Sequence, residues 1–161
     1  MTAVTIEPAE LTDVDAVVAL WRDCELTRPW NDPVRDFQDA VMGETSTVLV
    51  ARDRDAVVGA VMAGYDGHRG WLYYLGVTPG VQGSGRGRAL VVAAEAWLAA
   101  AGAVKVQLMV RRTNDAVLGF YERLGYDDQE TVVLGRRFDP APGGISGTCD
   151  RLSGAPRTVN P

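Results

Sequence analysis

The sequence has little lysine, histidine and cysteine, and each scarcity excludes a class of site. Lys105 is the only lysine, His68 is the only histidine, and the two cysteines, Cys24 and Cys149, lie far apart. A Walker loop for nucleotides ends in Gly-Lys-Ser/Thr, so a chain whose single lysine stands outside any glycine run lacks that loop. The distant cysteines form no metal-ligand cluster, and we expect no metal site.

The sequence also lacks a long apolar run and an excess of basic residues. No apolar run approaches the roughly 20 residues that cross a bilayer. The N-terminal segment, with Glu7 and Glu10, does not resemble a secretion signal. The net charge of −5 argues against a nucleic-acid binder, so an RNA-modifying factor built on the arginines near residues 86 to 112 is disfavoured. We expect a cytoplasmic protein that binds neither membranes nor nucleic acids.

A glycine-rich stretch, Gln82 to Arg88, separates an apolar run at 71–77 from an Ala/Val/Leu-rich run at 89–101. A strand, a glycine turn and a helix in this order direct backbone N–H groups at one point, which favours a phosphate or pyrophosphate ligand. The dinucleotide fingerprint Gly-x-Gly-x-x-Gly does not fit, because Arg88 or Leu90 stands in the place of its third glycine. The spacing that fits is Gln-x-x-Gly-x-Gly.

Hydrophobic periodicity and turn signals predict one α/β (α+β) domain over residues 1–138. The predicted strands cover 4–7, 47–52, 56–65, 71–77, 103–110 and 131–138, and the predicted helices cover 12–24, 33–42, 86–101 and 115–124. The composition changes to a Pro/Gly-rich tail at 139–161, which has few large apolar groups.

A second motif follows the glycine stretch at a fixed distance. Asn114 precedes a predicted helix that carries Phe-Tyr-Glu-Arg-Leu-Gly-Tyr at 120–126. Together the two motifs resemble the GNAT N-acetyltransferase superfamily, whose fold is a single mixed, mostly antiparallel sheet flanked by about four helices. The segments Arg-Pro-Trp-Asn-Asp-Pro at 28–33 and Tyr-Asp-Gly-His-Arg-Gly at 65–70 are similar to those of bacterial YpeA-type acetyltransferases.

The resemblance implies acetyl-CoA as co-substrate and an acetyl group transferred to a primary amine, either a small molecule or a protein N-terminus. It implies that the cofactor lies against the predicted strand before the glycine turn, the turn itself and the asparagine before the last helix: Leu75, Gly76, Val77, Gln82, Gly83, Ser84, Gly85, Arg86, Gly87, Arg88 and Asn114. Tyr121 matches the tyrosine that protonates the leaving thiolate in many members. It can equally be a packed aromatic residue of an amphipathic helix.

The resemblance does not identify a general base. Met109 occupies the position where ribosomal-protein N-terminal acetyltransferases of the superfamily carry a glutamate. The remaining candidates are Asp32, Asp66, His68, or Tyr73 and Tyr74 acting through water, and some members need no dedicated base. Residues of the two segments that depart from the general pattern are candidate contacts for the acceptor: Arg28, Trp30, Asp32, Asp66 and His68. A non-catalytic acyl-CoA sensing module is the alternative function, and a homodimer is compatible with the sequence.

Overall fold

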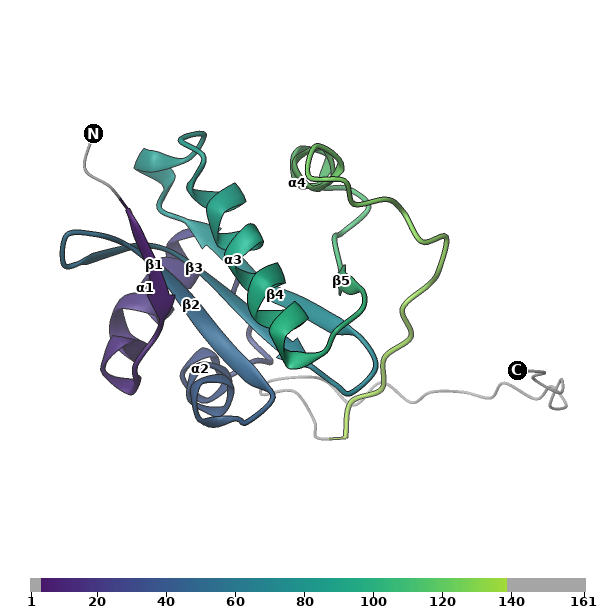
Figure 1. The fold of residues 1–161 in the computed structure, drawn as a ribbon, viewed down its shortest axis with the longest axis horizontal. Helices are drawn as coiled ribbons and strands as arrows, with labels where there is room; N and C mark the ends of the chain where they lie inside the picture. The colour runs from purple at the N-terminus through teal and green to yellow at the C-terminus, as the bar shows by residue number, and fades with distance from the viewer. Residues whose placement is uncertain (1–3, 139–161) are drawn as a thin grey trace, which may run out of the picture. The chain divides into compact units, whose positions relative to one another are not determined.

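The computed structural model describes residues 4–138 (Figure 1). The chain divides into two units, Met1–Thr131 and Val132–Pro161, and every helix and strand described here lies in the first. The elements are β1 (Thr5–Pro8), a 3-10 turn (Leu11–Asp13), α1 (Val14–Asp23), α2 (Pro33–Met42), β2 (Ser46–Asp53), β3 (Ala56–Tyr65), β4 (Gly70–Val77), a 3-10 turn (Pro79–Val81), α3 (Arg86–Ala101), β5 (Val106–Leu108) and α4 (Asp115–Glu122). The predicted tail at 139–161, with Cys149, lies outside the described residues.

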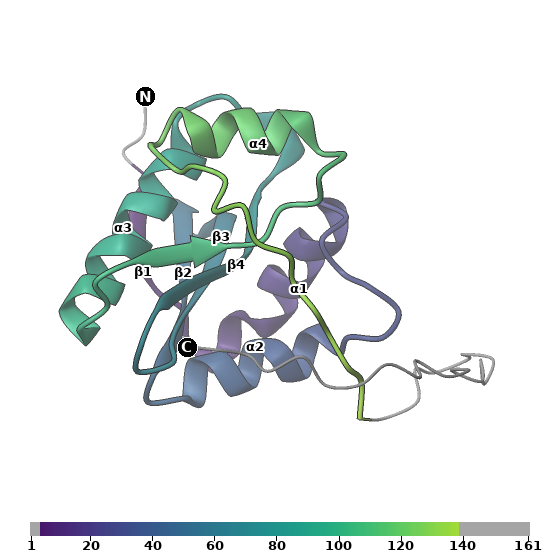
Figure 2. The same cartoon turned by 90° about the vertical axis from the view of Figure 1, so that its right-hand side faces the viewer.

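The five strands form one sheet in the order β1-β2-β3-β4-β5 (Figure 2). The first four strands are antiparallel neighbours, and β5 pairs parallel to β4 after the crossover through α3. A parallel pair needs such a crossover connection, which is why a helix separates β4 from β5 in the sequence. The predicted mixed, mostly antiparallel sheet is confirmed.

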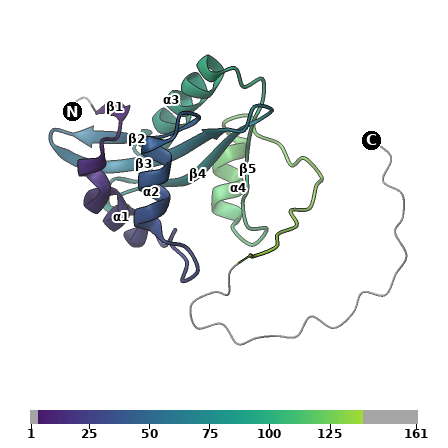
Figure 3. The ribbon, with the colours of Figure 1, turned by 90° about the horizontal axis from the view of Figure 1, so that it is seen from below.

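The helices cover the two faces of this sheet, with α1 and α2 on one face and α3 on the other (Figure 3). Alternate residues of β2 point to opposite faces: Val48 and Val50 pack under α1 and α2, whereas Leu49 and Ala51 pack under α3. Fully buried side chains of α1 and α2, such as Trp21 and Phe37, complete the first core. Buried side chains of α3 and Tyr121 of α4 belong to the second core.

A bulge interrupts β4 in the middle of the sheet. Ala60 of β3 pairs with Gly76 and Met62 pairs with Tyr73, so Val61 faces two residues of β4, Tyr74 and Leu75. Tyr74 takes a left-handed backbone conformation, with φ of 52°, which is strained for a residue with a large side chain. Because the bulge adds one residue to β4, the alternation of its side chains between the two faces of the sheet shifts at this point.

Two predicted strands differ from the structure. The strand predicted at 103–110 is reduced to Val106–Leu108, because β4 offers a pairing partner only from Gly70 to Leu72. The strand predicted at 131–138 is wrong for the described residues, none of which lies in a strand there. Its apolar side chains remain exposed, with Val132 at 77% and Leu134 at 91%. An apolar composition favours a strand only where a neighbouring strand accepts its hydrogen bonds.

Candidate functional site

The sheet opens into a fork where β4 and β5 part. The last paired residues are Leu72 and Leu108, and within the described residues no strand pairs with the outer edge of β4 from Tyr73 to Val77. Backbone N–H and C=O groups on such an edge can bind an extended chain as an added strand. Leu75, Gly76 and Val77, which the sequence predicts to contact the cofactor, lie along this edge.

The glycine loop follows directly after the fork and ends at the first turn of α3. Gly83 and Gly85 both take left-handed backbone conformations, with φ of 74° and 83°, and Gly85 is the N-cap of α3. No protein atom lies within 4 Å of a β-carbon built on either glycine, so this side of the loop is open. The first intrahelical hydrogen bond runs from Ala89 N to Gly85 O at 3.0 Å. The preceding N–H groups remain available for an anion.

The polar side chains of the loop hold the loop itself. Gln82 Nε2 donates to the carbonyl oxygen of Val77 at 3.0 Å, which closes the corner between β4 and the loop. Ser84 Oγ donates to Val81 O at 2.5 Å and accepts from Arg86 Nη1 at 2.6 Å. These contacts make the loop a preformed structure whose backbone, more than its side chains, faces the open side.

The two arginines of the loop have different surroundings. Arg86 Nη2 lies 3.5 Å from Asp53 Oδ2 of the β2–β3 turn, and only 18% of its side chain is exposed. Arg88 is exposed, and no hydrogen bond or ion pair to another described residue involves it. The guanidinium group of Arg86 is therefore engaged within the protein, whereas that of Arg88 is available to an anionic ligand.

The second sequence motif packs against the first. Asn114 caps α4 through a hydrogen bond from Val117 N to its Oδ1 at 3.3 Å. A β-carbon on Gly87 would stand 3.5 Å from the ring of Phe120, so the start of α3 and the middle of α4 are in contact. A β-carbon at this position would make ordinary van der Waals contact with that ring. Tyr121, the neighbour of Phe120, belongs to the same buried cluster as Leu90 of α3.

Tyr121 is a buried phenol with a protonated hydroxyl. Only 7% of the residue is exposed, and its ring packs edge-on against Phe120 and Tyr126 at 5.0 and 5.4 Å between ring centroids. Burial raises the pKa of Tyr121 to about 12, because the phenolate would lose its hydration. No hydrogen bond between its hydroxyl and another described residue is formed, in contrast to Tyr126, whose hydroxyl donates to Glu95 Oε1 at 2.7 Å. The hydroxyl of Tyr121 is thus an uncommitted proton donor.

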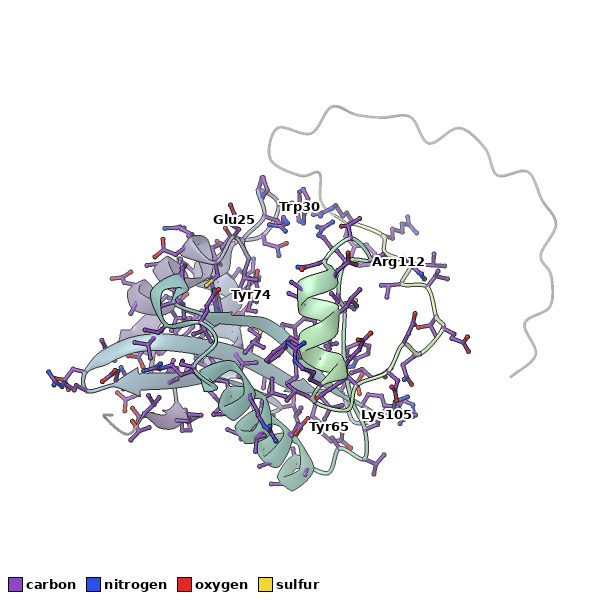
Figure 4. The ribbon with its side chains drawn as sticks, turned by 90° about the horizontal axis from the view of Figure 1, so that it is seen from above. Glu25, Trp30, Tyr65, Tyr74, Lys105 and Arg112 are labelled. Carbon is purple, nitrogen blue, oxygen red and sulfur yellow. The ribbon has the colours of Figure 1, made fainter. Side chains whose placement is uncertain are left out.

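The predicted acceptor contacts come from two separate segments. Arg28, Trp30 and Asp32 lie on the loop between α1 and α2, on which Figure 4 labels Glu25 and Trp30. Asp32 accepts hydrogen bonds from Val34 N and Arg35 N, both at 3.1 Å, and so acts as the N-cap of α2. Arg28 Nη1 donates to the carbonyl oxygens of Glu25 and Thr27 at 2.8 Å.

Asp66 and His68 lie on the β3–β4 turn, at the opposite end of β4 from the glycine loop. Asp66 accepts from the N–H groups of Arg69 and His68 and from Trp71 Nε1. Chiefly these backbone hydrogen bonds lower the pKa of Asp66 to about 2. A carboxylate with so low a pKa and three donors already bound is a poor proton acceptor at neutral pH. Asp66 therefore stabilises the turn.

Sequence reasoning missed the role of Tyr74 in connecting the fork to the α1–α2 loop. Its ring stacks on Trp21 at 4.2 Å between centroids, and its hydroxyl accepts from Asn31 Nδ2 at 3.1 Å and donates to Asp36 Oδ2 at 2.7 Å. Burial, with the Asp36 hydrogen bond, raises the pKa of Tyr74 to about 12. The only sequence signal was the doublet Tyr73-Tyr74, which does not reveal a bulge.

The structure thus combines an opened parallel strand pair, a glycine loop at a helix N-terminus and a buried tyrosine on the helix that contacts the end of this loop. The model of the acetyltransferase (GNAT) family matches residues 14–126. An acetyltransferase of Yersinia enterocolitica is 48% identical over 126 residues, which cover 78% of this chain and 89% of that protein. An acetyltransferase of Pectobacterium atrosepticum is 47% identical over 125 residues, with the same coverage.

Solved structures show the same fold at low sequence identity. The aminoglycoside N-acetyltransferase AAC(6')-Iy in complex with CoA has a TM-score of 0.75 and 16% identity, covering 86% of this chain and 97% of that one. Glucosamine-6-phosphate N-acetyltransferase from Arabidopsis thaliana has a TM-score of 0.64 and 17% identity, covering 85% and 99%. The chain belongs to the GNAT acetyltransferase family, and the predicted family, fold and acetyl-CoA-dependent activity are confirmed. The alternative of a non-catalytic sensing module is not favoured.

Within the part of the chain that the structure describes, no helix is long and apolar enough to cross a membrane, and no group of three or more His, Cys, Asp or Glu side chains could hold a metal ion.

Proposed function

We propose that this acetyltransferase transfers the acetyl group of acetyl-CoA to a small primary amine by direct attack on the thioester, with Tyr121 as a hydrogen-bond donor to the leaving sulfur. The observation that supports the proposal is the contact between Gly87 and Phe120, because it joins the helix that carries Tyr121 to the end of the glycine loop. A hydrogen-bond donor on α4 and an acyl-binding edge on β4 can act on the same thioester only if the fold holds the two elements close together.

The described residues fit acetyl-CoA. The open side of the glycine loop and the unpaired N–H groups at the start of α3 suit a pyrophosphate. The free edge of β4 at Leu75, Gly76 and Val77 suits an amide-bearing pantetheine arm. We assign the phosphate contacts to the backbone of residues 83–87 and to the exposed side chain of Arg88, and we assign to Arg86 and Gln82 the support of the loop. Asn114, as the cap of α4, holds the end of the helix that carries Tyr121.

The reaction requires two proton movements. The amine nitrogen forms a bond to the carbonyl carbon, the bond from carbon to sulfur breaks, and the sulfur leaves as a thiolate that takes up one proton. The attacking nitrogen releases one proton. A full transfer from a phenol of pKa about 12 to an alkyl thiolate of pKa about 8.5 is uphill by roughly 5 kcal/mol. Tyr121 therefore acts by donating a hydrogen bond while negative charge develops on sulfur, and solvent completes the protonation.

No side chain is assigned as the general base. Asp66 is held as a carboxylate of low pKa by three donors, Asp32 caps α2, and the hydroxyl of Tyr74 is bonded to Asp36. We propose that the acceptor enters as the neutral amine. Met109, which directly follows β5 and cannot accept a proton, agrees with an acceptor other than a protein N-terminus. The cytoplasmic location and a homodimer stay predictions of the sequence.

The test is CoA release from acetyl-CoA in the presence of a panel of small amines and N-terminal peptides, followed with a thiol reagent. We expect turnover with at least one small amine and none with peptides. Tight acetyl-CoA binding without turnover on any acceptor would support the sensing module instead, and turnover confined to peptides would contradict the acceptor class.

A further inference from the structure

Tyr74 joins the fork to the α1–α2 loop through side-chain hydrogen bonds, and Cys24 and Leu26 at the start of that loop lie against Val77 and Gly76. The backbone of Tyr74 forms the bulge of β4, and its hydroxyl bonds to Asn31 on that loop and to Asp36 on α2. The loop also carries Arg28 and Trp30, the predicted acceptor contacts. Figure 4 shows Tyr74 and Trp30 in one view, on the strand and on the loop respectively.

Closely packed aromatic side chains support the ring of Tyr74. Trp21 is fully buried, stacks on Tyr74 with an interplanar angle of 18°, and packs edge-on against Phe37. The left-handed backbone of Tyr74 is strained and persists only because its surroundings over-determine it. Movement of the bulge therefore moves the phenol ring, and the ring cannot move without changing its two hydroxyl hydrogen bonds.

On the side of the α1–α2 loop, the hydroxyl of Tyr74 is held by one residue, Asn31. Asn31 reaches Tyr74 through a single side-chain hydrogen bond, and its own N–H donates to Arg28 O at 3.0 Å within the loop. The raised pKa of Tyr74 keeps the hydroxyl protonated at neutral pH, so the phenol can accept from Asn31 and donate to Asp36 at once. Removal of the Tyr74 hydroxyl would therefore remove the hydrogen bond between Asn31 and β4.

We propose that Tyr74 is a positioning residue that couples occupancy of the fork by acetyl-CoA to the placement of the α1–α2 loop. An extended ligand that pairs with β4 beside the bulge fixes the backbone of Tyr74, and the phenol then fixes Asn31 and the loop. Linkage requires the reverse effect as well, so a placed loop favours acetyl-CoA binding. The proposal rests on the fork as the binding site of the pantetheine arm.

Hydrogen exchange of the amides at 25–32, measured with and without saturating acetyl-CoA, tests the coupling. In the wild-type protein we expect acetyl-CoA to slow exchange in this segment at least threefold. Tyr74→Phe keeps the stack on Trp21 but removes both hydroxyl hydrogen bonds, and we expect the slowing to disappear while the affinity for acetyl-CoA changes less than threefold. Asn31→Ala removes only the hydrogen bond between the loop and the hydroxyl of Tyr74, and we expect the slowing of exchange to disappear in this variant too.

Tyr65→Phe is the matched control, because it also removes a tyrosine hydroxyl but lies at the end of β3. It should leave the slowing intact. Equal slowing in Tyr74→Phe and wild type, or no slowing in a wild-type protein that binds acetyl-CoA, overturns the coupling. Calorimetry that detects no acetyl-CoA binding to the wild-type protein overturns the proposed cofactor site itself, so the two failures are distinguishable.

Discussion

The guanidinium group of Arg86 lies 3.5 Å from the carboxylate of Asp53, and this ion pair joins the glycine loop to the β2–β3 turn. The pair is partly buried, with 18% and 30% of the two side chains exposed. Arg86 also donates to Ser84, so the pair holds the loop at its base. The loop is therefore supported from a part of the sheet that does not contact the proposed ligand site.

Removal of this support should loosen the loop. We expect Asp53→Ala to lower the free energy of unfolding by about 1 kcal/mol, as for other partly exposed ion pairs, and to weaken acetyl-CoA binding about threefold. Arg88→Ala is the contrasting variant, because Arg88 is exposed: it should leave the unfolding midpoint unchanged and make acetyl-CoA affinity less sensitive to salt. Urea unfolding and calorimetry measure both effects. Equal behaviour of the two variants would contradict the distinction between support and contact.

Gly85 should not accept a side chain. Its φ of 83° makes Gly85→Ala unfavourable by about 1–2 kcal/mol, and the added β-carbon would project into the open side of the loop. We expect at least a tenfold loss of acetyl-CoA affinity. Gly80→Ala is the control, since Gly80 also faces open space but has no positive φ. A Gly85→Ala protein with wild-type affinity would exclude this loop as the pyrophosphate site.

Tyr121→Phe should lower turnover by about 100-fold, because the substitution removes the hydrogen bond to the leaving sulfur and keeps the ring. The affinity for acetyl-CoA and the thermal midpoint should stay near the wild-type values, since no described residue is hydrogen-bonded to this hydroxyl. Steady-state kinetics and calorimetry give the two readings. Tyr126→Phe, which loses the bond to Glu95, should show the opposite pattern of reduced stability with retained turnover. Unchanged turnover in Tyr121→Phe would remove this residue from the mechanism.

The pH dependence of kcat/KM should reflect the acceptor. Because the amine reacts in its neutral form, the rate should rise with pH until the pKa of the free amine is passed. Tyr121 must stay protonated, and its pKa of about 12 places the corresponding loss of activity at or above that pH. Two acceptors of different pKa should therefore give midpoints that differ by the same amount. A midpoint shared by both acceptors would instead indicate a side-chain base, and His68→Ala would test the single histidine.

Local features of the sequence were sufficient for most elements. Asp32 with Pro33 and Asn114 cap α2 and α4 as their residue types predict, and α3 spans the expected residues 86–101 up to Gly102, whose φ is 104°. These features depend on side chains within a few residues of each other. For the same reason the spacing of the glycine loop and of the second motif identified the family before the fold was known.

Non-local pairing decided the rest. The alternating pattern at 103–110 is longer than β5 itself, because β5 ends where β4 diverges from it. The bulge at Tyr74, its bonds to Asn31 and Asp36, and the orientation of Arg86 toward Asp53 all depend on segments more than 10 positions away. The sequence alone determined the family, and it predicted the cofactor loop and the candidate donor. Only the tertiary structure decided that Phe120 meets Gly87 and that the sheet opens beside Tyr73, because register, bulges and interelement contacts are set by packing of the whole domain.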